Sequence, residues 1–177
     1  MALLELLSRR KEAVSRRWCD RILDTYPPQT ATVMKRRGDP FANPVGQTIN
    51  TATAEIVDGL AAGRPLAELG APLDRIIRIR SIQDFTPSQA IGFILELKPI
   101  LRAELQGDLD AEMAKELEAL EGQLEQMTLL GFDIYVGCRE RYFEVRVSEL
   151  KRSIAAKMRK LGDPDLEDGS KTRDAGE

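Results

Sequence analysis

Hydrophobic residues recur at steps of three and four along most of this chain, which is the spacing of one face of an α-helix. In the first segment, residues 2–25, that face carries Leu3, Leu7, Val14, Trp18 and Ile22. The same pattern predicts further helices over residues 28–36, 45–62, 73–82, 87–106 and 109–161. No segment alternates apolar and polar residues as a half-buried strand does. The chain is therefore predicted to be all-α, a bundle of about six helices with a long, projecting C-terminal helix.

The stretch QDFTPSQ raises the question of whether it is a catalytic loop or the start of a helix. Thr86 and Gln89 have the spacing of a capping box, in which each side chain bonds the backbone of the other residue. Pro87 falls at the first helical position, where a missing N–H is harmless. Phe85 is placed to pack against the first turn. These signals favour a helix start, and Pro99 is expected to bend the helix that follows.

The last predicted helix is too long for a compact domain of this size. Residues 109–161 contain no proline, and at about 1.5 Å per residue they span roughly 80 Å. Part of this helix must therefore project or pair with another chain. Residues 104–125 carry eight acidic residues against one lysine, and residues 139–160 carry eight basic against three acidic residues. This polarity allows two copies to pair antiparallel, although two solvated faces explain it equally well.

Composition removes several classes of function. The chain has no histidine, which excludes histidine-dependent nucleophiles, His-ligated zinc and His-ligated haem. Cys19 and Cys138 are far apart and lack metal-binding spacing, so we predict buried thiols. No phosphate-binding or metal motif is present. We therefore predict a protein that is not an enzyme and has no cofactor.

The N-terminus and the apolar runs indicate a cytoplasmic protein. No apolar run approaches the ~20 residues of a membrane span, so membrane insertion is not expected. The basic segment 148–161 lacks the interleaved aromatic residues typical of nucleic-acid binding, which is likewise not expected. Residues 1–162 are predicted to form a single helical domain, and the charged residues 163–177 a disordered tail.

Several motifs together resemble one family. They are Trp18 with Tyr26-Pro27, DPFANPVG at residues 39–46, RIRSIQDFTPSQA at residues 78–90, FDIY at residues 132–135 with Cys138-Arg139-Glu140, and Arg146 with Lys151-Arg152. In this combination the chain resembles the RsbRD N-terminal sensory domains, which are related to the RsbR co-antagonists of bacterial stress response. The resemblance covers about residues 3–160.

The resemblance implies a globin-like, haem-free sensor domain that signals through protein partners. Family members usually precede an output domain, whereas this chain stops soon after Lys160. The expectation is a stand-alone homodimer that dimerises through its last helix and acts on a partner in trans. The alternatives are a haem-free sensor that binds a small apolar ligand, and an adaptor subunit of a redox complex.

Candidate site residues follow from these hypotheses. For a ligand pocket they are Trp18, Arg80, Gln83, Asp84, Phe85, Phe93 and Phe132. For a dimer or output helix they are Ile134, Tyr135, Cys138, Tyr142, Val145, Arg146, Lys151 and Arg152, although plain core packing would also explain the aromatic ones. An enzyme that uses Asp84 and Asp133 is the weakest hypothesis, because no spacing supports it.

Overall fold

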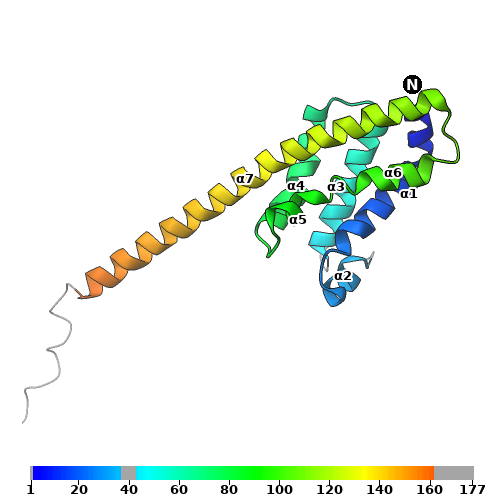
Figure 1. Ribbon diagram of the computed structural model, residues 1–177. Coiled ribbons are helices and arrows are strands. Elements are labelled where there is room, and N and C mark those ends of the chain that lie inside the picture. The colour runs from blue at the N-terminus through cyan, green and yellow to red at the C-terminus, as the bar shows by residue number, and fades with distance from the viewer. Residues whose placement is uncertain (1, 37–42, 162–177) are drawn as a thin grey trace, which may run out of the picture. The chain divides into compact units, whose positions relative to one another are not determined.

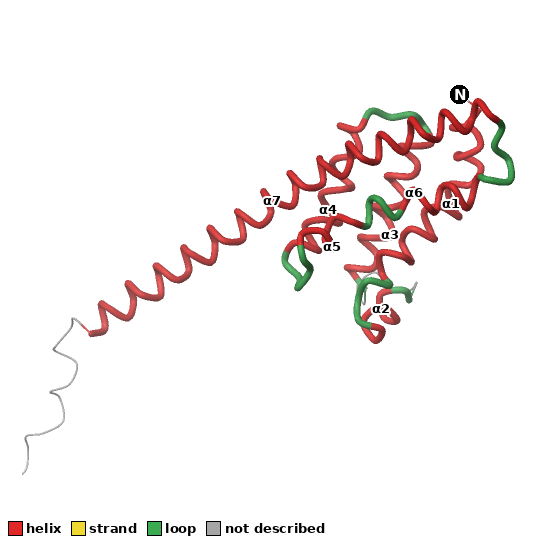
Figure 2. The backbone as a smooth tube through the Cα atoms, viewed as in Figure 1, coloured by secondary structure: helices red, strands yellow, loops and turns green. Residues whose placement is uncertain are grey.

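The computed structural model describes residues 2–36 and 43–161. Every regular element in these ranges is helical, which confirms the all-α prediction (Figures 1 and 2). The elements are α1 (Ala2–Leu23), α2 (Pro28–Met34), α3 (Pro44–Ala61), the 3-10 turn η1 (Leu66–Leu69), α4 (Gly70–Ser81), α5 (Pro87–Gly92), α6 (Leu97–Leu105) and α7 (Ala111–Leu161). The predicted disordered tail, residues 163–177, and part of the DPFANPVG motif lie outside the described residues.

The chain divides into two compact units, residues 1–139 and 140–177. In the first unit α1 packs against α3 and α6, and α3 also packs against α4 (Figure 1). Their apolar faces form one core around the fully buried Trp18, to which α7 contributes Leu117, Leu120 and Leu124. The described part of the second unit is the remainder of α7. Helix α7 therefore belongs to both units.

The predicted helix start at Thr86 is confirmed. The Thr86 backbone N–H donates to Gln89 Oε1 at 3.0 Å, and the Gln89 N–H donates to Thr86 Oγ1 at 3.3 Å. Pro87 occupies the first turn of α5. The stretch QDFTPSQ thus joins two helices, as the capping signals predicted.

The prediction of one bent helix over residues 87–106 is wrong, because the structure contains two helices separated by residues 93–96. In this break the backbone switches to shorter-range bonds, such as that from Ile94 N to Ile91 O. Pro99 explains the position, since its ring would clash with the carbonyl four residues earlier, that of Leu95. The helix therefore stops and restarts, and Pro99 lies in the first turn of α6, where proline is tolerated.

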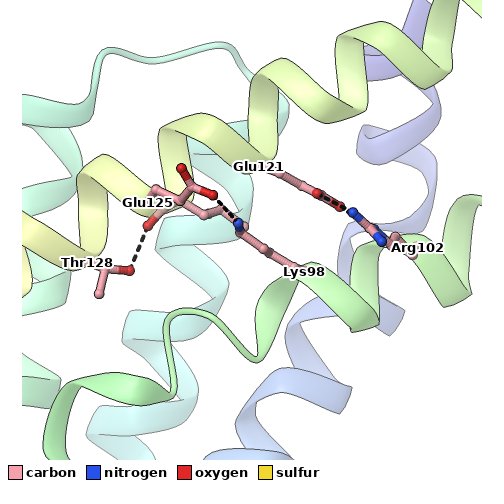
Figure 3. A network of polar contacts seen from close by, with 6 residues as sticks. Lys98, Arg102, Glu121, Glu125 and Thr128 are labelled. Atoms are coloured by element: carbon pink, nitrogen blue, oxygen red, sulfur yellow. Dashed lines mark hydrogen bonds and ion pairs between the residues drawn. The ribbon is translucent and has the colours of Figure 1, made fainter. Parts of the chain in front are cut away.

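Ion pairs attach α6 to α7 within the first unit, as Figure 3 shows. Arg102 donates to both carboxylate oxygens of Glu121, each at 2.6 Å, and Lys98 Nζ lies 2.7 Å from Glu125 Oε1. One helical turn beyond Leu124, Thr128 donates to the Leu124 carbonyl along α7. The acidic first part of α7 is thus neutralised in part by α6.

Candidate functional site

The first candidate site is a buried arginine in the first unit. Arg80, near the end of α4, is 0% exposed. Its Nε donates to the carbonyl of Ala90 at 3.1 Å, its Nη2 to the carbonyl of Gln89 at 2.8 Å, and its Nη1 to Thr25 Oγ1 at 3.0 Å. No ion pair joins Arg80 to a carboxylate within the described ranges. The charge is therefore balanced by dipoles and rings rather than by an anion.

Three aromatic rings surround this guanidinium group. Arg80 Cζ lies 4.1 Å from the ring centroid of Phe85, 5.5 Å from that of Tyr26 and 5.6 Å from that of Phe93. Each distance is within the range of a cation–π interaction, which in desolvated surroundings contributes about 2 kcal/mol or more. The Tyr26 hydroxyl also donates to Gln83 Oε1 at 2.9 Å. We call Thr25, Tyr26, Arg80, Gln83, Phe85 and Phe93 the Arg80 cluster.

Burial changes the proton affinities within the cluster. It lowers the pKa of Arg80, although the neighbouring Tyr26 acts in the opposite direction. Burial also raises the pKa of Tyr26, and the positive charge of Arg80 counteracts this only in part. Because arginine is not deprotonated in proteins, the cluster at neutral pH consists of a cation and a neutral phenol. It holds a charge without a group that titrates near pH 7.

The Arg80 cluster also stabilises the break between α5 and α6. In a continuous helix the carbonyls of Gln89, Ala90 and Phe93 would accept bonds from N–H groups four residues further on. Here Arg80 bonds the first two, and Trp18 Nε1 donates to the Phe93 carbonyl at 2.7 Å. Two side chains from other helices thus satisfy carbonyls at the break, which buried backbone groups require.

A surface hollow of about 480 Å³ lies beside the cluster. Its apolar wall includes Ile22, Phe85 and Phe93, and an ion pair between Arg21 and Glu96 lies at the same place. The hollow is also lined by Asp24, Thr25, Ser88, Gln89 and Gly92. Pockets for small ligands combine apolar walls with a few polar groups in this way.

The second candidate site is the part of α7 that lies in the second unit. All residues from 140 to 159 are exposed. Large apolar side chains recur there at steps of four and three: Phe143 is 53% exposed, Val147 49%, Leu150 60% and Ile154 49%. With about 100° of rotation per residue, these side chains fall on one face of the helix. Met158, 67% exposed, extends this face by one turn.

We call Phe143, Val147, Leu150, Ile154 and Met158 the apolar stripe. A shallow hollow lies along it, lined in part by Phe143, Val147 and Leu150. An exposed, contiguous apolar face such as this stripe often marks a site of interaction.

The described ranges contain no cluster of three or more acidic, cysteine or histidine side chains suited to hold a metal ion.

Comparison with protein families identifies the chain. Residues 12–150 match the model of the RsbT co-antagonist protein rsbRD N-terminal domain. The chain belongs to the RsbRD N-terminal domain family. An uncharacterized protein of Archaeoglobus fulgidus is 29% identical over 153 residues, which cover 82% of this chain and 87% of the relative. No solved structure matches the chain.

Membership shows that this RsbRD N-terminal domain is of a regulatory, stress-signalling kind. The family match includes the whole Arg80 cluster and ends at residue 150, within the apolar stripe. No helix in the described ranges is long and apolar enough to cross a membrane.

The structure brings together most residues of the predicted pocket. Arg80, Gln83, Phe85 and Phe93 belong to the Arg80 cluster, and Trp18 adjoins it, its ring centroid 5.9 Å from that of Phe93. The other two predicted residues are exposed: Asp84, and Phe132 at 48%. The rings near the Arg80 guanidinium within the described residues are those of Tyr26, Phe85 and Phe93, and Phe132 is not among them.

Sequence reasoning missed the role of Thr25 and Tyr26. It used Tyr26-Pro27 only as part of a family motif. A polar aromatic residue directly before a proline that ends a helix is a signal that could have directed attention there. Its partner at Arg80 was beyond prediction, because the two residues are joined only by tertiary structure.

The predicted output residues divide between the two units. Tyr135 and Cys138 are buried, at 6% and 7% exposed, and Ile134 packs against the core. Cys19, the other predicted buried thiol, is 4% exposed. The remaining output residues are exposed in the second unit: Tyr142, Val145, Arg146, Lys151 and Arg152. None of these five belongs to the apolar stripe, which sequence reasoning missed although its steps of four and three were visible.

Proposed function

We propose that this RsbRD N-terminal domain is a non-catalytic sensory or regulatory module that dimerises through the last part of α7. In this proposal the dimer acts on a protein partner in trans. The apolar stripe carries the proposal. Its members are about half exposed or more, from Val147 at 49% to Met158 at 67%. Exposing such side chains to water is unfavourable by about 25 cal/mol per Å² of apolar surface, so a protein surface that covers them is favoured.

The flanking charges support recognition rather than unspecific aggregation. Glu140, Glu144 and Glu149 alternate with Arg146, Lys151 and Arg152 along the exposed segment. Acidic and basic residues beside the apolar stripe keep this segment soluble, and they favour a partner surface that carries complementary charges. Two acidic residues earlier in the chain form ion pairs within the first unit, Glu104 with Arg17 and Asp108 with Arg10.

Light scattering after size exclusion tests the dimer. The full chain is expected to elute as a dimer at high micromolar concentration, and Leu150→Lys is expected to shift it to a monomer. Leu95→Lys is the matched control, because Leu95 is also exposed, at 43%, but lies in the first unit. A chain that is monomeric at high micromolar concentration, or a dimer unaffected by Leu150→Lys, would contradict the proposal.

A second candidate function has its own observation. The hollow beside the Arg80 cluster supports a haem-free, globin-like sensor that binds a small, mostly apolar ligand against Phe85 and Phe93. A thermal-shift screen with metabolites and fatty acids tests it, with Gly92→Leu as the blocking variant. Gly92 lines the hollow, and a Cβ atom at this position would have open space around it, with no atom of a more distant residue within 4 Å. A ligand that raises the Tm of the wild type but not of Gly92→Leu supports the site; no shift at millimolar ligand contradicts it.

A further inference from the structure

In the proposed dimer, two copies of the last part of α7 face each other along a line of residues, the seam. The further inference concerns the relative orientation of the two helices, and it rests on the proposed dimerisation. We infer that two copies of this chain pair antiparallel through residues 140–158, in a register that places Phe143 against the partner's Ile154 and Val147 against the partner's Leu150. From Phe143 to Ile154 the apolar stripe has steps of four, three and four residues, which are those of the seam of a two-stranded coiled coil. In this register, the residues that face each other in the middle of the antiparallel pair are all apolar.

Side-chain shape alone does not fix the orientation. Val147 and Ile154 alternate with Leu150 along the seam, and β-branched residues that alternate with leucine also suit a parallel pair. A parallel pair in register would place each of these residues against its own copy. The orientation therefore has to come from the charged residues in and beside the seam.

The charged residues that continue the seam favour the antiparallel arrangement. Continuing the same steps, Glu140 precedes Phe143 by three residues and Lys157 follows Ile154 by three, and both are exposed. In the antiparallel register Glu140 faces the partner's Lys157 at both ends of the seam. In a parallel pair Glu140 would face Glu140 and Lys157 would face Lys157. Like charges directly opposite each other at a seam destabilise it.

The residues that flank the seam agree. In the antiparallel register Glu144 lies beside the partner's Lys151, so each dimer gains two further pairs of opposite charge. In a parallel pair the flanking contact joins residues five positions apart on the two chains, which would bring Arg146 to the partner's Lys151. Opposite charges at such positions set partner choice and orientation in coiled coils.

Register shifts are excluded by the same residues. Sliding one chain by a heptad in one direction would place Lys157 against Val147, and sliding it in the other would place Glu140 against Leu150. Each shift buries a charge against an apolar side chain, which is unfavourable without a partner. The proposed register is the one that matches apolar with apolar and acid with base along residues 140–158.

Charge reversal at Lys151 distinguishes the two orientations by the sign of its effect. In the antiparallel dimer Lys151→Glu creates two Glu–Glu contacts, and we expect the dimer dissociation constant to rise roughly 3- to 30-fold. Glu144→Lys combined with Lys151→Glu restores opposite charges and should return affinity to near the wild-type value. In a parallel dimer Lys151→Glu would instead relieve repulsion by Arg146 and tighten the dimer. Sedimentation equilibrium at low salt measures all three proteins.

Cysteine cross-linking tests the orientation independently, because a disulfide forms only between residues that lie close together. A mixture of Phe143→Cys and Ile154→Cys chains should form the mixed disulfide dimer under mild oxidation, and Ile154→Cys alone should not cross-link. Wild type treated in parallel controls for Cys19 and Cys138, which are both buried. The antiparallel orientation is overturned if Lys151→Glu tightens the dimer or leaves its affinity unchanged. It is also overturned if Ile154→Cys chains cross-link to each other. In both cases the proposed dimer itself would still hold. A monomeric wild type overturns the proposed dimer itself.

Discussion

Two sets of apolar residues on α7 have the same spacing and opposite surroundings. Leu117, Leu120 and Leu124 in the first unit are at most 5% exposed, whereas Val147, Leu150 and Ile154 in the second are 49%, 60% and 49% exposed. Both sets follow steps of three and four residues. Such spacing defines an apolar face, but what covers it depends on segments distant in sequence. The first set is covered by the core of its own chain, and we propose that another copy of the chain covers the second.

The free energy of unfolding should distinguish the two sets most strongly. Leu124→Ala removes a fully buried side chain and should lower the free energy of unfolding by about 2–5 kcal/mol. Leu150→Ala should change it by less than about 0.5 kcal/mol when the chain is monomeric. Urea denaturation followed by circular dichroism at low protein concentration measures both. Equal losses in the two variants would mean that the exposed segment is covered within the monomer.

The next comparison contrasts two arginines on α4. Arg80→Met removes the donors to the carbonyls of Gln89 and Ala90 together with the cation–π contacts, and should cost about 2–4 kcal/mol of stability. Arg78→Met is the control, because Arg78 is exposed and forms an ion pair with Asp74 one turn earlier in the same helix. Its loss should be below about 0.5 kcal/mol. If the two variants unfold at the same urea concentration, the buried guanidinium does not hold the break between α5 and α6.

A third comparison uses two glycines of α7. A Cβ atom at Gly131 would lie 2.8 Å from Ile94 Cδ1 and 3.2 Å from Ile77 Cδ1, whereas one at Gly122 meets nothing within 4 Å. Gly122→Ala should therefore stabilise the chain by about 0.5–1 kcal/mol through helix propensity. Gly131→Ala should be less favourable by about 1 kcal/mol or more, because the core must shift. Thermal unfolding of both variants checks the difference, and equal gains would contradict the close approach of α7 to α4 and to Ile94.

The smallest effect concerns the ion pair between α6 and α7. Hydrogen bonds from Arg102 lower the pKa of Glu121 despite partial burial of the carboxylate. A carboxylate with a depressed pKa stabilises the fold above its unfolded pKa and loses that contribution as pH falls through the folded value. Glu121→Gln should lower Tm by about 1–3 °C at pH 7 and by less at pH 3. A difference that grows on acidification would contradict this sign.

The sequence predicted the helical class, the capping box at Thr86 and the apolar face of the first helix that carries Trp18, because these depend on local pattern. The break at residues 93–96 was not predicted, since the donors that stabilise it, Arg80 and Trp18, come from other helices. Arg80, Gln83, Phe85 and Phe93 were expected to line a ligand pocket, but their arrangement around a buried cation was not predicted. The apolar stripe has a regular spacing of four and three residues in the sequence. The predicted output helix did not include it, because the prediction relied on the aromatic residues nearby.

Hydrogen exchange along α7 shows whether a second copy covers the apolar stripe, because it reports protection residue by residue. We predict that backbone amides of residues 140–158 exchange quickly in dilute protein and become protected as concentration rises. Amides of residues 112–138 should be protected at every concentration. Exchange in residues 140–158 that does not change between low and high micromolar protein would show that no second copy covers this surface.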